Sequence, residues 1–365
     1  MKTKSLYIHI PFCQAICSYC DFCKVYYQEN LVDRYLQALT KELQDLHIRE
    51  KLVTIYIGGG TPSSLSYQQL ELLMSMIAPY ISKQTIEVSI EINPESIDPK
   101  KLDILKKGRV NRLSIGVQTF NEEILKTLER KHNNAQVISV IKEAKRVGFD
   151  NISIDMMYGL PNQTLHDIER DLEIIKTLNI QHISYYSLIL EKHTRLKNED
   201  YKVLDGELET QIQDCVETML SSMGFKQYEI SNYAKRDCTS KHNLAYWKYD
   251  NYYGIGVGAS SKIDDKIMEH NRNIYAYIEG KNTKKETSLA KEDSLFNHIM
   301  MSLRLLEGLD IQQVNRLYNI DLEKKYSSII SKYIDKGWLH ITAGKLHCNS
   351  QSIRFLNTIL IDFLE

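Results

Sequence analysis

Four of the seven cysteines lie within eleven residues of the chain, at Cys13, Cys17, Cys20 and Cys23. The spacing is C-x3-C-x2-C, and another cysteine follows after two further residues. Such thiols can form one buried face of a helix, bind zinc or hold an iron–sulfur cluster. Structural zinc usually uses two separated ligand pairs, whereas a compact thiolate loop suits a cluster. Four thiolates would close a cluster, and three would leave one iron open to chelate a small molecule.

A second set of candidate residues lies at the ends of apolar runs further along the chain. Gly58-Gly59-Gly60-Thr61-Pro62 directly follows one run, and glycines let backbone amides approach a ligand closely. Glu91, Gln118 and Asp155 lie at the ends of the next three runs. Each feature alone is explained by a tight turn or by a helix cap. Together they predict a site at the carboxyl edge of a sheet, where barrel folds place their chemistry.

Six β-branched and aromatic runs alternate with helical patterns in the first half of the chain. The runs are Ser5–Ile10, Thr54–Ile57, Glu87–Ile92, Arg112–Val117, Asn151–Met156 and His182–Leu190. The helical patterns are Leu31–Leu46, Tyr67–Ile77, Asn121–Thr127, Asn134–Val147 and Leu165–Leu178. Strand-then-helix units predict an α/β fold with a parallel sheet and right-handed crossovers. A doubly wound sheet and an incomplete (β/α) barrel both fit, because periodicity does not choose between them.

The pattern changes after residue 205. A helix is predicted over Gly206–Met223 and a strand over Gln227–Ser231, and an aromatic, glycine-rich run covers Tyr246–Ser261. From about residue 270 the chain is mostly helical and ends near a hairpin of Trp338–Ile341 and Lys345–Cys348. This order of helices and hairpin suggests a small winged-helix-like module.

The length of 365 residues suits one large domain and one smaller domain. We expect a barrel domain of residues 1–235 and a smaller, mostly helical domain of residues 236–365. The charged stretch Glu279–Lys291 is the best candidate for a linker. The low proline content and modest glycine content exclude disordered and fibrous classes of protein.

The charge balance restricts the kind of partner. Lys and Arg number 46 and Asp and Glu number 47, so the net charge is −1. A chain without a basic surplus is poorly suited to nucleic acid or an anionic membrane as its main partner. No run approaches the roughly 18 apolar residues of a transmembrane helix, and no signal-peptide cleavage pattern follows the N-terminus. We therefore expect a cytoplasmic protein with reduced thiols, whose peripheral contact with the inner face of the membrane would depend on a partner.

The first three cysteines resemble the C-x3-C-x2-C signature of radical S-adenosylmethionine (SAM) enzymes. The resemblance implies a partial (β/α)6 barrel and a 4Fe–4S cluster held by Cys13, Cys17 and Cys20, with SAM chelated to the fourth iron. Enzymes of that family cleave SAM reductively to a radical that abstracts hydrogen, which implies a reductant such as flavodoxin or ferredoxin. Cys23 departs from the signature. A fourth thiolate would block chelation of SAM, so we predict that Cys23 is not a ligand.

Further motifs are similar to those of the anaerobic coproporphyrinogen III oxidase family, and this resemblance covers nearly the whole chain. They are Tyr7-Ile-His-Ile-Pro-Phe-Cys13, Gly58-Gly-Gly-Thr-Pro62, Ser89-Ile-Glu-Ile-Asn-Pro94, Ser114-Ile-Gly-Val-Gln-Thr-Phe120 and Asp155-Met-Met-Tyr-Gly-Leu-Pro161. The resemblance implies that the cluster-bound SAM contacts Tyr7, Gly59 and Glu91. It also implies contacts to a second SAM from Gly60, Thr61, Gln118, Arg130 and Asp155. Carboxylates suit ammonium and hydroxyl groups, and an arginine suits a carboxylate.

Within this family the chain resembles the haem-chaperone branch more than the decarboxylase branch. It begins twelve residues before Cys13, which leaves no room for the longer N-terminal extension of the decarboxylase. Tyr228-Glu-Ile-Ser-Asn-Tyr-Ala234 and His242-Asn-Leu-Ala-Tyr-Trp247 are similar to runs of the chaperone branch, and the second run is linked there to haem binding. The resemblance implies His242 as a haem ligand at the start of the C-terminal domain. The residue types alone favour the alternative that His242 caps a helix and the aromatic side chains belong to the core.

These resemblances imply a haem chaperone that carries a SAM-liganded 4Fe–4S cluster and delivers haem to a respiratory-chain protein. One alternative is an oxygen-independent coproporphyrinogen III oxidase, which decarboxylates propionate side chains. Another is a radical enzyme that converts a different tetrapyrrole. All three need the cluster, and they differ in whether the tetrapyrrole is bound unchanged or converted. A simple electron carrier would leave the glycine turn and the strand-end residues unexplained.

Overall fold

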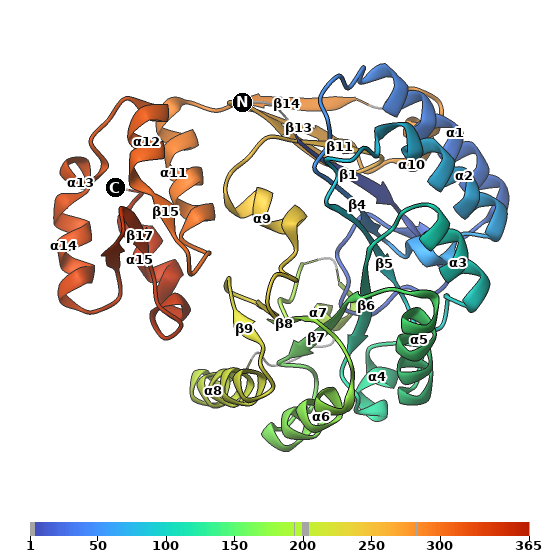
Figure 1. The fold of residues 1–365 in the computed structure, drawn as a ribbon, viewed down its shortest axis with the longest axis horizontal. Helices are drawn as coiled ribbons and strands as arrows, with labels where there is room; N and C mark the ends of the chain where they lie inside the picture. The colour runs from blue at the N-terminus through green and yellow to red at the C-terminus, as the bar shows by residue number, and fades with distance from the viewer. Residues whose placement is uncertain (1–3, 193, 199–203, 282, 365) are drawn as a thin grey trace.

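The core of the protein is a twelve-stranded sheet whose central strands are parallel. The computed structural model describes residues 4–192, 194–198, 204–281 and 283–364, and its strand order is β14-β13-β12-β11-β1-β4-β5-β6-β7-β8-β10-β9. The parallel strands are β1 (Ser5–Ile10), β4 (Thr54–Gly59), β5 (Glu87–Ile92), β6 (Arg112–Gln118), β7 (Asn151–Tyr158), β8 (His182–Ser187) and β11 (Tyr252–Ile255). Figure 1 shows a curved sheet with helices around its outer face. The predicted α/β fold with a partial barrel is confirmed.

Amphipathic helices cover the outer face of the parallel strands. They are α1 (Glu29–Asp45), α2 (Tyr67–Ile77), α3 (Pro99–Lys107), α4 (Glu122–Thr127), α5 (Asn134–Val147), α6 (Leu165–Thr177) and α8 (Gly206–Ser222). Helices α2, α5 and α6 begin with capping boxes, in which two side chains satisfy free backbone amides reciprocally. Helix α3 is not among the predicted helical patterns, and its start is marked by the cap Asp98 followed by Pro99. No helix among the described residues is both long and apolar enough to cross a membrane.

The pairing of the parallel strands brings the predicted site residues to one edge of the sheet. Glu91 on β5 lies opposite Ser114 on β6, and Asp155 on β7 lies opposite Gly116 on β6. Gly59 ends β4, the strand that precedes β5 in the sheet. Because all these strands run in the same direction, their carboxyl ends form one rim.

The chain after β8 extends both edges of the sheet. The extending elements are β9 (Lys226–Gln227), β10 (Asn232–Ala234), β12 (Ser260–Ile263), β13 (Lys266–His270) and β14 (Lys284–Ser288). Between them, α9 (Lys241–Trp247) leads across from β10 to β11, and it packs on β4. The predicted linker Glu279–Lys291 therefore contains a strand of the sheet. The boundary predicted between residues 235 and 236 falls within the span of this sheet.

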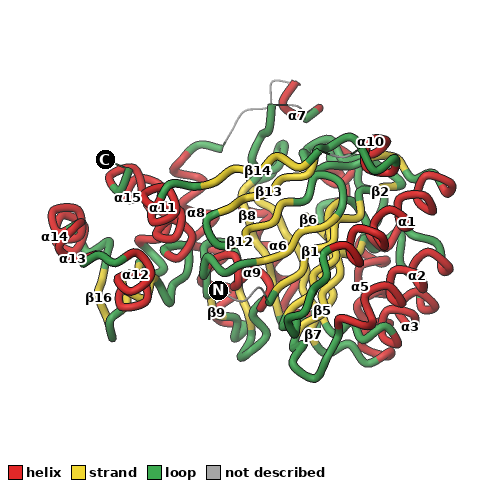
Figure 2. The backbone as a smooth tube through the Cα atoms, turned by 90° about the horizontal axis from the view of Figure 1, so that it is seen from above, coloured by secondary structure: helices red, strands yellow, loops and turns green. Residues whose placement is uncertain are grey.

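The residues after β14 form a smaller unit with its own apolar core. Its elements are α11 (Lys291–Ser302), β15 (Leu309–Asp310), α12 (Ile311–Tyr318), α13 (Leu322–Lys325), α14 (Ser327–Asp335), β16 (His340–Thr342), β17 (Lys345–His347) and α15 (Leu356–Asp362). Helices followed by a hairpin match the predicted winged-helix-like order, and β15 adds a third strand to the hairpin. Figures 1 and 2 show this unit beside the large sheet. Arg354 joins the two units through ion pairs with Asp214 and Glu217 of α8.

The half-buried side chain of Glu42 ties the antiparallel extension to α1. Its Oε2 accepts hydrogen bonds from the Gly256 amide at 3.0 Å and the Tyr277 hydroxyl at 2.6 Å. Its Oε1 lies 3.0 Å from His270 Nε2 and 2.8 Å from Lys284 Nζ. Burial acts to raise the pKa of this carboxyl, but the His270 contact and the other donors outweigh burial and lower the pKa to about 2.

Replacing Glu42 with Gln is therefore expected to lower the free energy of unfolding near pH 7 by about 2–3 kcal/mol. In the wild type this contribution is complete above the ordinary pKa of 4.5 and is lost as the pH falls toward 2. The variant should lack that part of the pH dependence, which urea denaturation at several pH values measures. Glu71→Gln, on the exposed side of α2, is the matched control and should change neither quantity. Equal stability of E42Q and wild type at neutral pH would contradict the role assigned to Glu42.

Candidate functional site

The clustered cysteines lie in an irregular loop that follows β1. The short strands β2 (Phe12–Cys13) and β3 (Val25–Tyr26) pair with each other and form the base of this loop. Cys17 and Cys20 lie between them outside any helix, which removes the alternative of a buried helix face. Ser18 fixes the loop to the rim, because its amide and its hydroxyl each donate to a backbone carbonyl at the end of α4, both at 3.3 Å.

The loop borders a cavity of about 330 Å³ at the carboxyl edge of the sheet. Its lining includes most of the predicted site residues: Cys13, Cys17, Cys20, Gly59, Gly60, Thr61, Glu91, Gln118, Arg130 and Asp155. Cys23, Tyr7 and His242 are not among the lining residues. The fourth cysteine instead has its Sγ 3.7 Å from the backbone oxygen of Arg272. The structure thus brings three thiols together with the strand ends and separates Cys23 from them.

Gly58 and Gly59 hold the carboxylate of Glu91 against the end of β4. Glu91 accepts hydrogen bonds from the Gly59 amide and the Tyr56 hydroxyl, each at 2.9 Å. A Cβ atom on Gly58 would lie 2.7 Å from Glu91 Oε1, and one on Gly59 would lie 2.5 Å from the His9 ring. Gly59 also has a φ of +116°, which side chains other than hydrogen rarely allow. The turn therefore requires Gly59, and Gly58 leaves the space that the Glu91 carboxylate occupies.

Glu91 and Asp155 place two half-buried carboxyl groups in the same cavity. Burial raises the pKa of Glu91 to about 7, and the neighbouring Asp155 raises it as well. Burial also raises the pKa of Asp155, although hydroxyl donors, including Ser114 at 3.1 Å, oppose this shift. A cationic ligand would favour the ionised form of both groups. This side of the cavity therefore suits a ligand with positive charge and hydroxyl groups.

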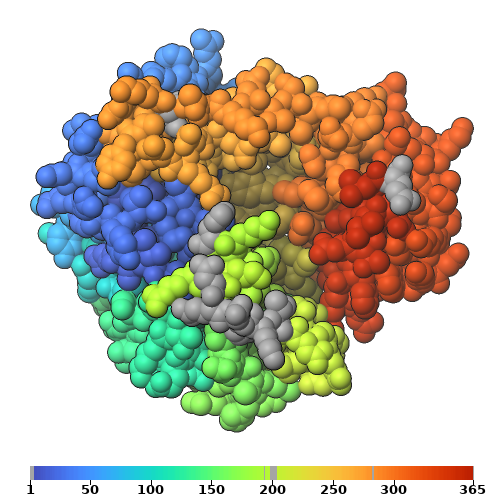
Figure 3. Space-filling model, turned by 180° about the vertical axis from the view of Figure 1, so that it is seen from behind, coloured from blue at the N-terminus to red at the C-terminus, as the bar shows by residue number. Residues whose placement is uncertain are grey.

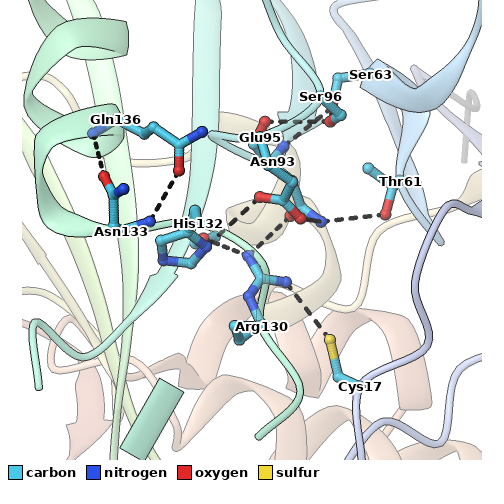
Figure 4. A network of polar contacts seen from close by, with 11 residues as sticks. Cys17, Thr61, Ser63, Asn93, Glu95, Ser96, Arg130, His132, Asn133 and Gln136 are labelled. Carbon is cyan, nitrogen blue, oxygen red and sulfur yellow. Dashed lines mark hydrogen bonds and ion pairs between the residues drawn. The ribbon is translucent and has the colours of Figure 1, made fainter. Parts of the chain in front are cut away.

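Arg130 provides a positive charge in the same cavity. Its Nη2 donates to the Gly116 carbonyl at 2.6 Å and to Asn93 Oδ1 at 3.1 Å, and its Nη1 donates to Cys17 Sγ at 3.6 Å (Figure 4). Within the described ranges, Arg130 Nε and Gln118 Oε1 are buried and have no hydrogen-bond partner. Gln118 also has a φ of +72°, next to a bulge in β6. Buried polar atoms without partners are rare, so their presence beside three thiols fits a cavity that takes a polar ligand.

The thiols themselves are a suitable donor set for an iron–sulfur cluster. No three His, Cys, Asp or Glu side chains in the described part of the chain are placed to hold a single metal ion. A cubic cluster has a different requirement, because each thiolate binds its own iron. Burial raises the pKa of Cys13 to about 11 and also raises that of Cys20. Both thiols must therefore release a proton when they bind metal.

Further residues that were not predicted also line the cavity, among them Tyr56, Asn93 and Tyr186. Asn93 Nδ2 donates to Thr61 Oγ1 at 3.3 Å, which connects the glycine turn to the next strand end (Figure 4). Asn93 follows Glu91 by two positions, and side chains two apart on a strand share one face. This alternation along a strand would have predicted Asn93 from Glu91. It would also have predicted Tyr56, which precedes Gly58 by two positions.

Tyr7 and His242 contact Tyr56 rather than the cavity. The ring of Tyr7 stacks on Tyr56 with 6.2 Å between centroids, and the ring of His242 stacks on it at 5.2 Å. His242 is fully buried, with Nδ1 2.9 Å from Thr54 Oγ1 and Nε2 2.7 Å from Tyr246 Oη. Both ring nitrogens of His242 are therefore engaged within the protein.

Helix α9, which carries His242, joins the cavity to the C-terminal unit. Ser240, rather than His242, is its N-cap. Asn243 lines the cavity, and Trp247, one turn later, has the guanidinium of Arg304 5.5 Å from the centre of its ring. Side chains four positions apart lie on the same face of a helix. One face of α9 thus contacts both the thiol-bearing cavity and the segment that follows α11.

Replacing Glu91 with Gln is expected to stabilise the metal-free protein at alkaline pH. The pKa of Glu91 is about 7 in the folded chain, whereas its ordinary value is 4.5. As the pH rises from 4.5 to 7, such a carboxyl group destabilises the folded state. The neutral amide removes this effect, so the gain should be about 2–3 kcal/mol near pH 8 and should disappear near pH 4. Urea denaturation at the two pH values measures the difference. No gain at the higher pH would show that Glu91 is not held in its protonated form.

Two family models match the chain. The Radical SAM superfamily model matches residues 7–175, which include the cysteine loop and the strand ends that surround the cavity. The HemN C-terminal domain model matches residues 289–355, which begin directly after β14 and cover most of the smaller unit. The first match thus covers much of the large apolar core, and the second covers most of the core of the smaller unit.

Full-length relatives and one solved structure agree with these matches. The Heme chaperone HemW of Lactococcus lactis is 35% identical to this chain, over 100% of this chain and 98% of that protein. The Heme chaperone HemW of Bacillus subtilis is 36% identical, over 99% of both. The Heme chaperone HemW of Escherichia coli is 31% identical, over 99% of this chain and 98% of that protein. Coproporphyrinogen III oxidase (HemN) from Escherichia coli, a radical SAM enzyme, matches with a TM-score of 0.86 at 22% identity, covering 99% of this chain and 90% of that one. The structural likeness shows a shared fold. The full-length identities show that the chain belongs to the HemW family within the radical SAM superfamily.

Proposed function

We propose that this chain is a haem chaperone that carries a 4Fe–4S cluster and SAM and delivers haem to a respiratory-chain protein. One observation supports the cluster and SAM most directly: three thiols line a cavity together with the strand-end residues, and Cys23 does not. Cys13, Cys17 and Cys20 would hold the cluster, which supplies an open iron for SAM and an electron from a reductant such as flavodoxin or ferredoxin. The relatives named heme chaperone HemW support haem as the cargo.

The charges around the cavity fit the groups that SAM presents. Glu91 and Asp155 suit its ammonium and ribose hydroxyl groups, and Arg130 suits its carboxylate. The residues proposed for the first SAM are Tyr7, Gly59 and Glu91, and those proposed for a second are Gly60, Thr61, Gln118, Arg130 and Asp155. Tyr7 acts in this scheme through Tyr56, because it does not line the cavity itself.

His242 is the proposed haem ligand. Burial lowers its pKa to about 3, so the imidazole is neutral at physiological pH, as a ligand to haem iron must be. Because both nitrogens are engaged, haem binding at His242 requires the loss of its contact with Thr54 or with Tyr246. The proposed setting is the cytoplasm, where the haem-receiving protein brings the chaperone to the inner face of the membrane.

Serine in place of Cys13, Cys17 or Cys20 is expected to abolish the cluster, lowering bound iron from about four per chain toward zero. Cys23→Ser is the matched control and should keep the cluster, because Cys23 lies outside the cavity lining. Iron and sulfide analysis with electron paramagnetic resonance of the anaerobically reconstituted protein measures the outcome. A cluster lost in Cys23→Ser would contradict the assignment of three ligands.

The chaperone function is tested by incubating the reconstituted chain with SAM, a reductant and either haem or coproporphyrinogen III. We expect haem to be retained intact and coproporphyrinogen III to keep all its carboxyl groups, as followed by absorption spectra and mass spectrometry. Loss of carboxyl groups would establish the decarboxylase instead. Haem consumed in step with 5′-deoxyadenosine would establish an enzyme that converts the tetrapyrrole.

In the same assay His242→Ala should weaken haem binding, and Tyr246→Phe separates a ligand from a structural residue. The second variant removes the hydroxyl that engages His242 Nε2, so it should bind haem at least as tightly as wild type. If both variants bind haem as wild type does, His242 is not the ligand.

A further inference from the structure

A second cavity, of about 450 Å³, lies between the large sheet and the C-terminal unit. Its lining comes from β7, β8, α8 and the segment around β9 and β10 on one side, and from the C-terminal unit on the other. It includes Tyr158, Tyr185, Tyr186, Tyr233, Arg304 and Arg354. Tyr186 also lines the thiol-bearing cavity, so the two cavities share a wall. Figure 3 shows the surface hollowed between the C-terminal unit and the rest of the chain.

Arg304 is the unusual residue of this cleft. It is half-buried, its Nε is buried without a partner, and no described residue forms an ion pair or a side-chain hydrogen bond with it. The carboxyl group of Glu229 attracts it electrostatically from beyond ion-pair distance. The contact that the structure does give the guanidinium is with the ring of Trp247, at 5.5 Å. A guanidinium held in this way, without an anion, is suited to form a bidentate contact with a carboxylate.

The rest of the lining is suited to a flat aromatic ligand. Tyr158 and Tyr185 stack with 6.2 Å between ring centroids. Tyr185 is 3% exposed, and its hydroxyl has no partner among the described residues. Arg354 lines the cleft as well, where it neutralises Glu217 at 3.1 Å, and Glu209 is a further acidic lining residue. Arg304 is thus the positive charge in the cleft that no carboxylate of the described residues pairs.

We propose that this interdomain cleft is a docking site for the tetrapyrrole, additional to the ligand site proposed at His242, which does not line it, with Arg304 holding a propionate carboxylate and the tyrosines lining the macrocycle. The geometry itself defines a flat aromatic carboxylate, and the choice of a tetrapyrrole rests on the proposed function. Binding here places the ligand against Tyr186, on the other side of the wall from the thiol-bearing cavity. It also places a carboxylate next to the guanidinium that packs on Trp247, at the end of α9. Binding in the cleft can therefore be sensed along the same helix that carries His242 and Asn243.

The test is a haem titration of the reconstituted full chain, followed by absorption. Loss of one charge-assisted contact costs on the order of a tenfold or greater change in affinity. Arg304→Gln should therefore bind haem about tenfold more weakly, and Arg304→Lys should fall between this variant and wild type. Arg316→Gln removes an exposed arginine of α12 and is the matched control, which should bind as wild type does.

A second arm uses haem whose propionates are esterified. Wild type should bind this ester about tenfold more weakly than haem, whereas Arg304→Gln should bind the two ligands alike, because the contact is already missing. Two results would overturn the proposed binding in the cleft and leave the chaperone function standing. Either Arg304→Gln binds haem as tightly as wild type does, or it prefers haem over the ester as strongly as wild type does. A wild-type chain that binds neither ligand would instead overturn the proposed function itself.

Discussion

The site depends on how closely the end of β4 approaches its neighbours. At three successive glycines, a Cβ atom would meet a different part of the site: the Glu91 carboxylate at 2.7 Å, the His9 ring at 2.5 Å and Cys13 Sγ at 3.0 Å. One turn without side chains therefore contacts the next strand end, the preceding strand and the cysteine loop together. Any larger residue in the turn would push these three apart. The parallel pairing of the strands then adds Gln118 and Asp155 to the same rim.

The arrangement favours function over stability at several points. Carboxyl groups with raised pKa values and buried polar atoms without partners destabilise a folded chain, and the thiol-bearing cavity contains both, in Glu91 and Asp155 and in Arg130 Nε and Gln118 Oε1. Glu42, by contrast, lies among four donors and has a lowered pKa. This contrast between Glu91 and Glu42 supports the cavity as the place where a charged ligand completes the structure.

Much of the fold followed from local patterns in the sequence. The runs Ser5–Ile10, Glu87–Ile92, Tyr67–Ile77 and Asn134–Val147 have the predicted bounds, because alternating or helical periodicity with clear caps is a local signal. The parallel pairing of β11 with β1 did not follow, since it joins segments more than 200 residues apart and depends on packing. The same limit applies to β12, β13 and β14, which extend the sheet by packing rather than by a local pattern.

In the candidate site, too, local sequence patterns predicted some residues, and others depend on how the chain packs. Three cysteines and seven of the strand-end or neighbouring residues were predicted, and the structure places them around one cavity. Tyr7 and His242 instead lie against Tyr56, and the strand pattern alone did not separate lining residues from those one layer behind. Arg304 carried no sequence signal at all, because an arginine without a counter-ion is recognised only when the surrounding residues are seen. Helix α9, which reaches from Asn243 at one cavity to Trp247 beside Arg304, links these parts physically.

The most direct test of the account is the hyperfine coupling between the reduced cluster and SAM labelled at its amino nitrogen and carboxylate oxygen. If Cys13, Cys17 and Cys20 are the three ligands, one iron stays open to SAM, so we expect coupling to both labels. The coupling should persist in Cys23→Ser, whose cluster would then have the same three ligands. A cluster that forms fully but shows no coupling to either label would mean that its irons are closed to SAM, and it would contradict the central claim that one cavity holds both.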